Sequence, residues 1–240
     1  MKTTSASARA RQEILRRLRS AMPTQALPEP ELGAYRSGPL GRGSLGPRID
    51  PLGLVQLFES AARGWRAEVH HAGLPDWSAK VGELLIARGC QSVAVGASLA
   101  REPGFAAGMG GLSLQTFSAG LPDWKSRLFD SIDAGISRVD AGIADTGTLL
   151  LRPGPDEPRT LSLVPPVYVA ILQVSALYAS LPAAIDALQP QRDMPTNLLL
   201  VTGPSKTSDI QQTLAFGAHG PKELLVVLVD DVSHERGQQP

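Results

Sequence analysis

Short apolar runs alternate with helical segments along most of the chain, and this alternation strongly constrains the possible folds. Runs such as 92–95 and 223–229 are apolar almost throughout, which is typical of strands buried on both faces. Strands that alternate with helices predict a mostly parallel sheet covered by helices on both sides. The hairpin-like stretch 135–175 adds an antiparallel portion. We therefore expect a three-layer α/β fold with a mostly parallel sheet.

The predicted elements follow from the apolar periodicity and from the Pro and Gly residues that end each segment. Helices are predicted at 7–20, 51–63, 78–88, 122–129, 182–188 and 208–216. Strands are predicted at 66–70, 92–95, 112–117, 135–143, 147–152, 161–164, 168–174, 197–202 and 223–229.

The charge is unevenly distributed along the 240 residues, although its sum is zero. Residues 1–20 carry six basic side chains and one acid, or +5, which leaves 17 basic and 22 acidic side chains, or −5, for the rest. We predict an N-terminal basic helix (1–22), a Pro/Gly-rich connection (23–49), an α/β domain (50–232) and a polar tail (233–240). The Arg- and Ser-rich start also resembles a mitochondrial transit peptide, but an ordinary basic helix is the preferred interpretation.

Composition excludes several classes of protein. Neutral net charge argues against a nucleic-acid-binding protein, which needs a basic face. The chain has one cysteine, Cys90, so it cannot form an intrachain disulfide, a cysteine-ligated zinc site or an iron–sulfur cluster by itself. No apolar run approaches the 18 residues of a membrane-spanning helix, and no secretory signal is evident.

A turn-like motif lies between two predicted strands. Asp145, Thr146 and Gly147, followed by Thr148, resemble the aspartic-protease signature. That chemistry needs two carboxylates sharing one proton, and the chain has no second copy of the motif, so a homodimer would have to supply it. A tight turn is the simpler interpretation, since Asp favours turns and Gly supplies a positive φ. The remaining alternative is a ligand-binding loop formed by these four residues.

A second candidate loop begins at Gly203, between a predicted strand and the predicted helix 208–216. It lacks the glycines of a nucleotide-binding P-loop. A helix N-terminus at the carboxyl end of a strand nevertheless attracts anions. Lys206 would add a positive charge, and Ser205 and Thr207 would add hydroxyl donors.

The alternative for the same segment is a plain helix cap. Ser208 and Gln211 have the spacing of a capping box, and Asp209 is a favourable acid for a first helical turn. His219 precedes the last predicted strand and could serve as a general acid or base if it lay beside this loop. In adjacent parallel strands, however, the start of one strand and the end of the other lie at opposite edges. Asp145 and His219 are the candidate catalytic residues, and none of the four histidines has a spacing that suits a metal.

Three segments carry a family resemblance. The runs 141–149, 203–210 and 217–224, which contain Asp145, Lys206 and His219, resemble signature segments of the lactate utilization protein C family, whose members carry a LUD domain. The resemblance covers most of residues 50–232. Lys206 stands where the family usually has Arg, which replaces a bidentate donor by a point charge.

The resemblance implies a fold of the NagB/RpiA/CoA-transferase-like type. It also implies a bacterial cytoplasmic subunit that works with two partners in oxidising L-lactate to pyruvate, with the iron–sulfur clusters in the partners. On this hypothesis the chain binds a small anion or a partner's anionic group at Gly203–Asp209. The alternatives are a standalone enzyme acting on a phosphorylated or CoA-linked small molecule, and an interaction scaffold. CoA transferases use a Glu nucleophile, and no Glu of the domain (59, 68, 83, 102, 157, 223) lies in an obvious Gly-rich elbow.

Overall fold

The computed structural model describes residues 3–21, 51–116, 128–188, 195–208, 214–216 and 220–232. The chain divides into two compact units, Met1–Arg42 and Gly43–Pro240. The first contains the helix α1 (Thr3–Ala21), in which Glu13 pairs with Arg16 and Arg17, and its apolar side chains Ile14 and Leu18 are exposed. In the described part of the chain, no helix is both long and apolar enough to cross a membrane.

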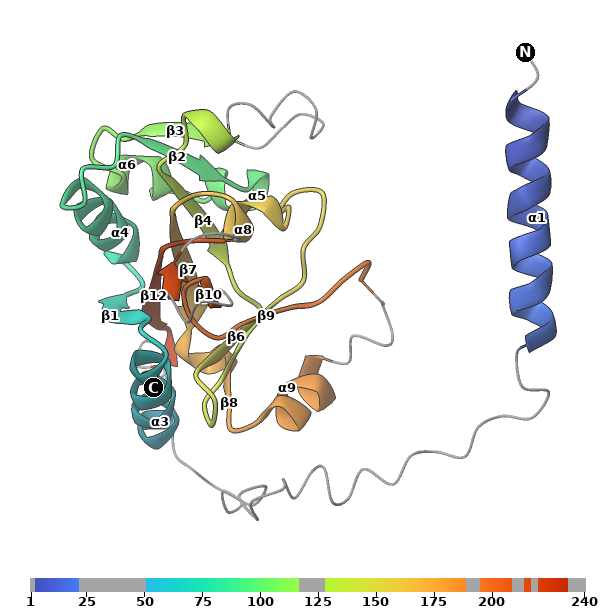
Figure 1. The fold of residues 1–240 in the computed structure, drawn as a ribbon. Coiled ribbons are helices and arrows are strands. Elements are labelled where there is room, and N and C mark those ends of the chain that lie inside the picture. The colour runs from blue at the N-terminus through green and yellow to red at the C-terminus, as the bar shows by residue number, and fades with distance from the viewer. Residues whose placement is uncertain are drawn as a thin grey trace. The chain divides into compact units, whose positions relative to one another are not determined.

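A six-stranded, fully parallel sheet is the centre of the second unit, in the order β1-β12-β7-β4-β2-β3 (Figure 1). Its strands are β1 (Glu68–Gly73), β2 (Ser92–Val95), β3 (Ser113–Thr116), β4 (Ala134–Arg138), β7 (Val167–Gln173) and β12 (Glu223–Asp230). The central strands β7 and β12 are buried along almost their whole length, as a sheet covered on both faces requires.

The sheet has a point at which the direction of strand addition reverses. From β2 the chain adds β3 on one side, and it then adds β4, and β7 beyond it, on the other side of β2. In open α/β sheets, the crevice outside the carboxyl ends of the strands at such a switch point is the usual ligand site.

A smaller mixed sheet has the order β8-β5-β6-β9 and contains β5 (Ala141–Ile143), β6 (Thr148–Leu151), β8 (Leu177–Tyr178) and β9 (Leu199–Val201). Its pairs β5–β6 and β6–β9 are antiparallel, whereas β5–β8 is parallel. This sheet is the antiparallel portion that the sequence predicts. A separate antiparallel pair joins β10 (Lys206–Ser208) to β11 (Leu214–Phe216).

Two apolar cores lie on opposite faces of the main sheet. On one face, α4 (Trp77–Ile86) and α6 (Phe105–Gly108) pack against alternate residues of the strands. On the other, the core is shared with α3 (Pro51–Gly64) and the smaller sheet. The other helical segments are α5 (Ala97–Ala100), α8 (Thr160–Leu163), α9 (Leu181–Leu188) and the 3₁₀ turn η1 (Val174–Ala176). The expected three-layer α/β fold is confirmed.

Three predicted elements are wrong. The segment predicted as a helix at 208–216 contributes Ser208 to β10 and Leu214–Phe216 to β11, so neither of its two ends is helical. The predicted strand 161–164 belongs to a single helical turn, α8, because a four-residue apolar run carries no periodicity that separates helix from strand. The predicted strand 135–143 is two strands that belong to different sheets. Most of the predicted helix 122–129 lies outside the described residues.

Candidate functional site

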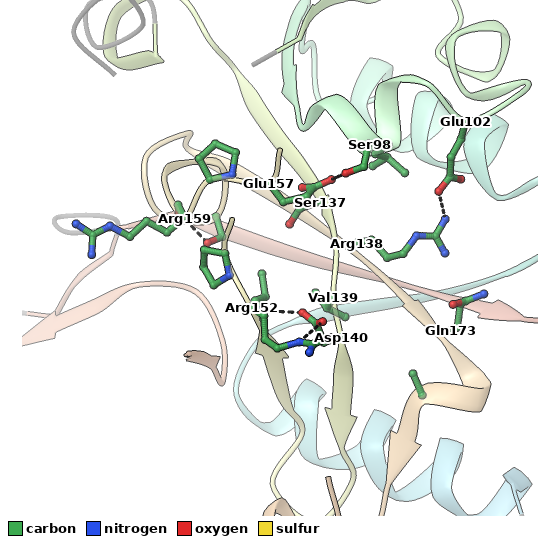
Figure 2. A pocket seen from close by; sticks show the side chains of 16 residues that line it. Ser98, Glu102, Ser137, Arg138, Val139, Asp140, Arg152, Glu157, Arg159 and Gln173 are labelled. Atoms are coloured by element: carbon green, nitrogen blue, oxygen red, sulfur yellow. Dashed lines mark hydrogen bonds and ion pairs between the residues drawn. The ribbon is translucent and has the colours of Figure 1, made fainter. Parts of the chain in front are cut away.

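A cavity of about 460 Å³ opens at the carboxyl ends of β2, β4 and β7, beside the switch point (Figure 2). Its walls come from α5, from residues 137–140 at the end of β4, from the segment that follows β6, and from the end of β7. We call it the carboxyl-edge cavity. Its polar lining residues are Ser98, Glu102, Ser137, Arg138, Asp140, Arg152, Glu157, Arg159, Ser162 and Gln173.

Glu157 is an acid of this lining with a buried carboxyl oxygen. Its carboxyl packs against the backbone of Gly96, and a Cβ at Gly96 would lie 2.5 Å from Glu157 Oε1. Ser98 Oγ donates a hydrogen bond to Oε1 over 3.2 Å, whereas Oε2 is buried and has no hydrogen-bond partner among the described residues. Burial raises the pKa of Glu157 to about 7, although the hydrogen bond from Ser98 and the charge of Arg138 act in the opposite direction. Glu157 is thus placed to gain or lose a proton near neutral pH.

Three arginines and three carboxylates line the cavity. Arg138 donates from Nη2 to Glu102 Oε1 over 2.6 Å. Arg152 holds Asp140 through two hydrogen bonds of 2.7 Å, one from its Nε and one from its backbone N–H. Arg159 makes no ion pair within the described residues, and its side chain extends away from the other labelled groups in Figure 2.

A buried tyrosine lies beneath the lining. The side chain of Tyr168 on β7 is fully buried, and its hydroxyl lies 2.7 Å from Ser137 Oγ, which lines the cavity. Burial raises the pKa of Tyr168, and the charges of Glu157 and Asp140 add to this effect. The phenol therefore stays neutral and fixes the position of Ser137.

Eight of the ten site residues predicted from the sequence lie in the described part of the chain, and none of these eight lines this cavity. Asp145, Thr146 and Gly147 form the tight turn between β5 and β6, and Gly147 has a φ of +65°. A Cβ at Gly147 would lie 2.6 Å from the carbonyl carbon of Ala61, so this glycine allows the turn to approach α3 closely. Asp145 is exposed at its tip. Partial burial of the carboxyl raises the pKa of Asp145, and a hydrogen bond with Thr146 opposes this.

The structure brings parts of the two predicted loops together. Thr148 Oγ1 lies 2.9 Å from Thr202 Oγ1, directly before Gly203. Gly203 packs against Trp65, close to the end of α3, and has a φ of +142°. These contacts give the two segments a packing role between the smaller sheet and α3. Thr202 and Gly203 also line a hollow of about 530 Å³ beside Trp65.

Ser205 lies beside the start of β12. Its backbone N–H donates to the carbonyl of Pro221 over 2.8 Å, and Gly220 packs against its side chain. The end of one strand and the start of the next lie at opposite edges only when the two are neighbours in one parallel sheet. β9 belongs to the smaller sheet and β12 to the main sheet, so the segment that follows β9 can lie beside the start of β12. Lys206 and Thr207 are part of β10, and so is Ser208, the residue at which the sequence predicts the helix to begin. Asp209 and His219 lie outside the described residues.

The sequence interpretation considered Glu157 only as a CoA-transferase nucleophile, set it aside, and did not predict it as a site residue. Its signal is an acidic residue in a segment rich in Pro and Gly, 153–158, directly after a buried strand. The close packing of the Glu157 carboxyl depends on Gly96. This glycine is 61 positions earlier and lies against the carboxyl only in the folded chain.

Metal-binding groups are not evident in the described part of the chain. The described residues contain no cluster of three or more His, Cys, Asp or Glu side chains that could hold a metal ion. Cys90 is buried, and burial raises the pKa of its thiol. One buried thiol does not fit the four cysteine ligands that an iron–sulfur cluster commonly requires.

The parallel six-stranded sheet, the smaller mixed sheet and the covering helices define an α/β protein with a cavity at its switch point. A comparison with solved structures supports this fold. A DUF162 family protein from Deinococcus radiodurans matches with a TM-score of 0.56 and 19% sequence identity, covering 76% of this chain and 99% of that one.

Sequence comparisons identify the family more closely. The LUD domain model matches residues 55–229, so the chain belongs to the LUD domain family, as its three signature segments predict. An uncharacterized protein of Neisseria meningitidis serogroup B is 36% identical over 93% of this chain and 96% of its own length. Two proteins named lactate utilization protein C also match. The one from Oceanobacillus iheyensis is 29% identical over 50% of this chain and 53% of its own length, and the one from Macrococcus caseolyticus is 33% identical over 41% and 45%. The chain thus spans about half the length of these two relatives.

Proposed function

We propose that this protein is the C subunit of a bacterial, cytoplasmic system that oxidises L-lactate to pyruvate. Its contribution would be to bind a small anion in the carboxyl-edge cavity and to associate with redox partner subunits. The observation that carries the anion-binding part is the cavity itself, which lies at the switch point and is lined by three arginines. Membership in the LUD domain family, together with relatives named lactate utilization protein C, supports the metabolic assignment.

The redox cofactors belong to the partners in this proposal. A chain with Cys90 as its one cysteine cannot supply the thiolates of an iron–sulfur cluster. The electrons removed from lactate would therefore pass to clusters held by other subunits. Arg138 and Arg152 would attract the substrate carboxylate through their guanidinium charge.

The test is co-purification followed by an activity assay. The full chain, tagged and expressed in its native bacterium during growth on L-lactate, is expected to co-purify with proteins that contain iron and acid-labile sulfide. The complex, but not the isolated chain, should reduce an artificial electron-accepting dye when L-lactate is added. Turnover of L-lactate and dye by the isolated chain would contradict the subunit role.

One observation favours the alternative of a standalone enzyme acting on a CoA-linked or phosphorylated small molecule. Glu157 is a carboxyl in a switch-point cavity, the kind of group that an acyl-transfer enzyme uses. Against this, its Oε2 is buried and Oε1 accepts a hydrogen bond from Ser98. Incubation of the isolated chain with acyl-CoA donors and hydroxylamine distinguishes the two functions. Only the enzyme would form a trapped hydroxamate at Glu157.

A further inference from the structure

We propose that the carboxyl-edge cavity binds one small organic anion together with one proton, and that the proton resides on Glu157 while the anion faces Arg138. This inference rests on the proposed function only in placing the ligand in the same cavity. It does not require lactate oxidation or any partner.

The position of Glu157 is the first support. Gly96 fits closely against its carboxyl, and the neighbouring backbone N–H of Ala97 donates to Asp156 O over 2.8 Å. The segment that carries Glu157 is therefore held against the end of β2. Ser98 fixes Oε1, so Oε2 is the oxygen left without a partner in the described part of the structure. A buried, unpaired carboxylate oxygen is costly, and protonation removes most of that cost.

The charges around Glu157 do not stabilise its ionised form well. Ser98 and the backbone of Leu99 face it from α5, and both favour the carboxylate, as does Arg138 from β4. Asp156, on the same segment, disfavours the carboxylate. Arg138 is also held by Glu102 over 2.6 Å, which offsets its positive charge. The pKa of about 7 reflects this balance, in which burial outweighs the favourable contacts.

The charge count of the lining couples anion and proton. Arg138 and Arg152 are paired with Glu102 and Asp140, so an ionised Glu157 adds a negative charge that no arginine of these pairs offsets. Protonation of Glu157 removes that charge, and an entering anion then meets less electrostatic repulsion. A bound anion close to Glu157 in turn raises the pKa of its carboxyl, because like charges oppose ionisation.

The same groups indicate the ligand class. Arg138 uses one terminal nitrogen for Glu102, and a guanidinium has five N–H donors, so it can also receive a ligand carboxylate. A protonated Glu157 can donate a hydrogen bond to a hydroxyl or keto oxygen. Short 2-hydroxy and 2-keto carboxylates carry both a carboxylate for Arg138 and a hydroxyl or keto oxygen for Glu157.

The experiment is isothermal titration of the full chain with L-lactate and with pyruvate, at several pH values and in two buffers of different ionisation enthalpy. We expect net proton uptake on binding near pH 7. If only the protonated form binds, the apparent affinity should fall about fivefold between pH 7 and pH 8, in proportion to the protonated fraction of Glu157. Glu157→Gln should still bind the anion but without proton uptake and with a flat pH dependence. Arg138→Gln should weaken binding by at least about tenfold, which corresponds to a lost charge-assisted hydrogen bond.

Glu83→Gln is the matched control, because Glu83 is an exposed acid on α4 that does not line the cavity. Glu83→Gln should show the same proton uptake and the same pH dependence of anion affinity as the unaltered chain. Binding without proton uptake, or a pH dependence that persists in Glu157→Gln, would overturn the role of Glu157. If neither L-lactate nor pyruvate binds, the anion site is overturned. The titration and the co-purification test different claims. The subunit role can fail while proton-coupled binding holds, and proton-coupled binding can fail while the subunit role holds.

Discussion

Replacement of Glu157 by glutamine should change how the stability of the folded protein depends on pH, even without a ligand. Burial raises the pKa of Glu157 from an ordinary 4.5 to about 7. The folded protein therefore holds this proton more tightly than the unfolded chain does. The resulting stabilisation is fully present below about pH 4.5, decreases as the pH rises, and is lost above about pH 7.

The magnitude follows from the difference between the two pKa values. A difference of about 2.5 corresponds to about 3 kcal/mol, as an upper limit. Glu157→Gln has no proton to lose, so its free energy of unfolding relative to the unaltered chain should rise by up to that amount between pH 4.5 and pH 8. Urea unfolding of both proteins across this range measures the difference, with Glu83→Gln as the control. A difference that stays constant with pH would refute the buried, proton-binding Glu157.

Three further predictions concern the packing and reactivity of the domain. Gly147→Ala should lower the free energy of unfolding by about 1–3 kcal/mol, because φ is +65° and the new Cβ would meet the α3 backbone. Gly64→Ala, where a Cβ would meet nothing within 4 Å, should have little effect in the same thermal or urea unfolding assay. Tyr168→Phe should cost about 1 kcal/mol in urea unfolding, since it removes the hydrogen bond to Ser137; an unchanged midpoint would contradict that contact. Cys90 should react with a thiol reagent only after unfolding, because its thiol is buried and its pKa is raised, and rapid labelling of the folded chain would be inconsistent with this packing.

The inner strands β2, β7 and β12 of the main sheet could be predicted because they are apolar along almost their whole length. The segment 92–95 was predicted with its observed bounds, and 223–229 differs from β12 by one residue. The segment 208–216 was misassigned as a helix because its polar and apolar residues fit a capped helix locally, whereas β10 and β11 pair with each other in the folded chain. Local patterns predict elements, but the pairing of short strands is decided by contacts that no local pattern contains.

The candidate site was predictable only in part. The three signature segments identify the family, and two of them contribute Thr148 and Gly203 to contacts around the end of α3. The carboxyl-edge cavity could not be located in the same way, because it depends on which strands are neighbours. Glu157 and Arg138 line the same cavity because the ends of β2 and β4 are neighbours, and the sequence does not give the order of these strands in the sheet.

The most direct test of the central claim is the position of a bound anion in a crystal structure of the full chain with L-lactate or pyruvate. Density for the anion is expected in the carboxyl-edge cavity, with its carboxylate near Arg138 and its hydroxyl or keto oxygen near Glu157. Density beside Ser205 and Lys206, with the carboxyl-edge cavity left without the anion, would contradict it.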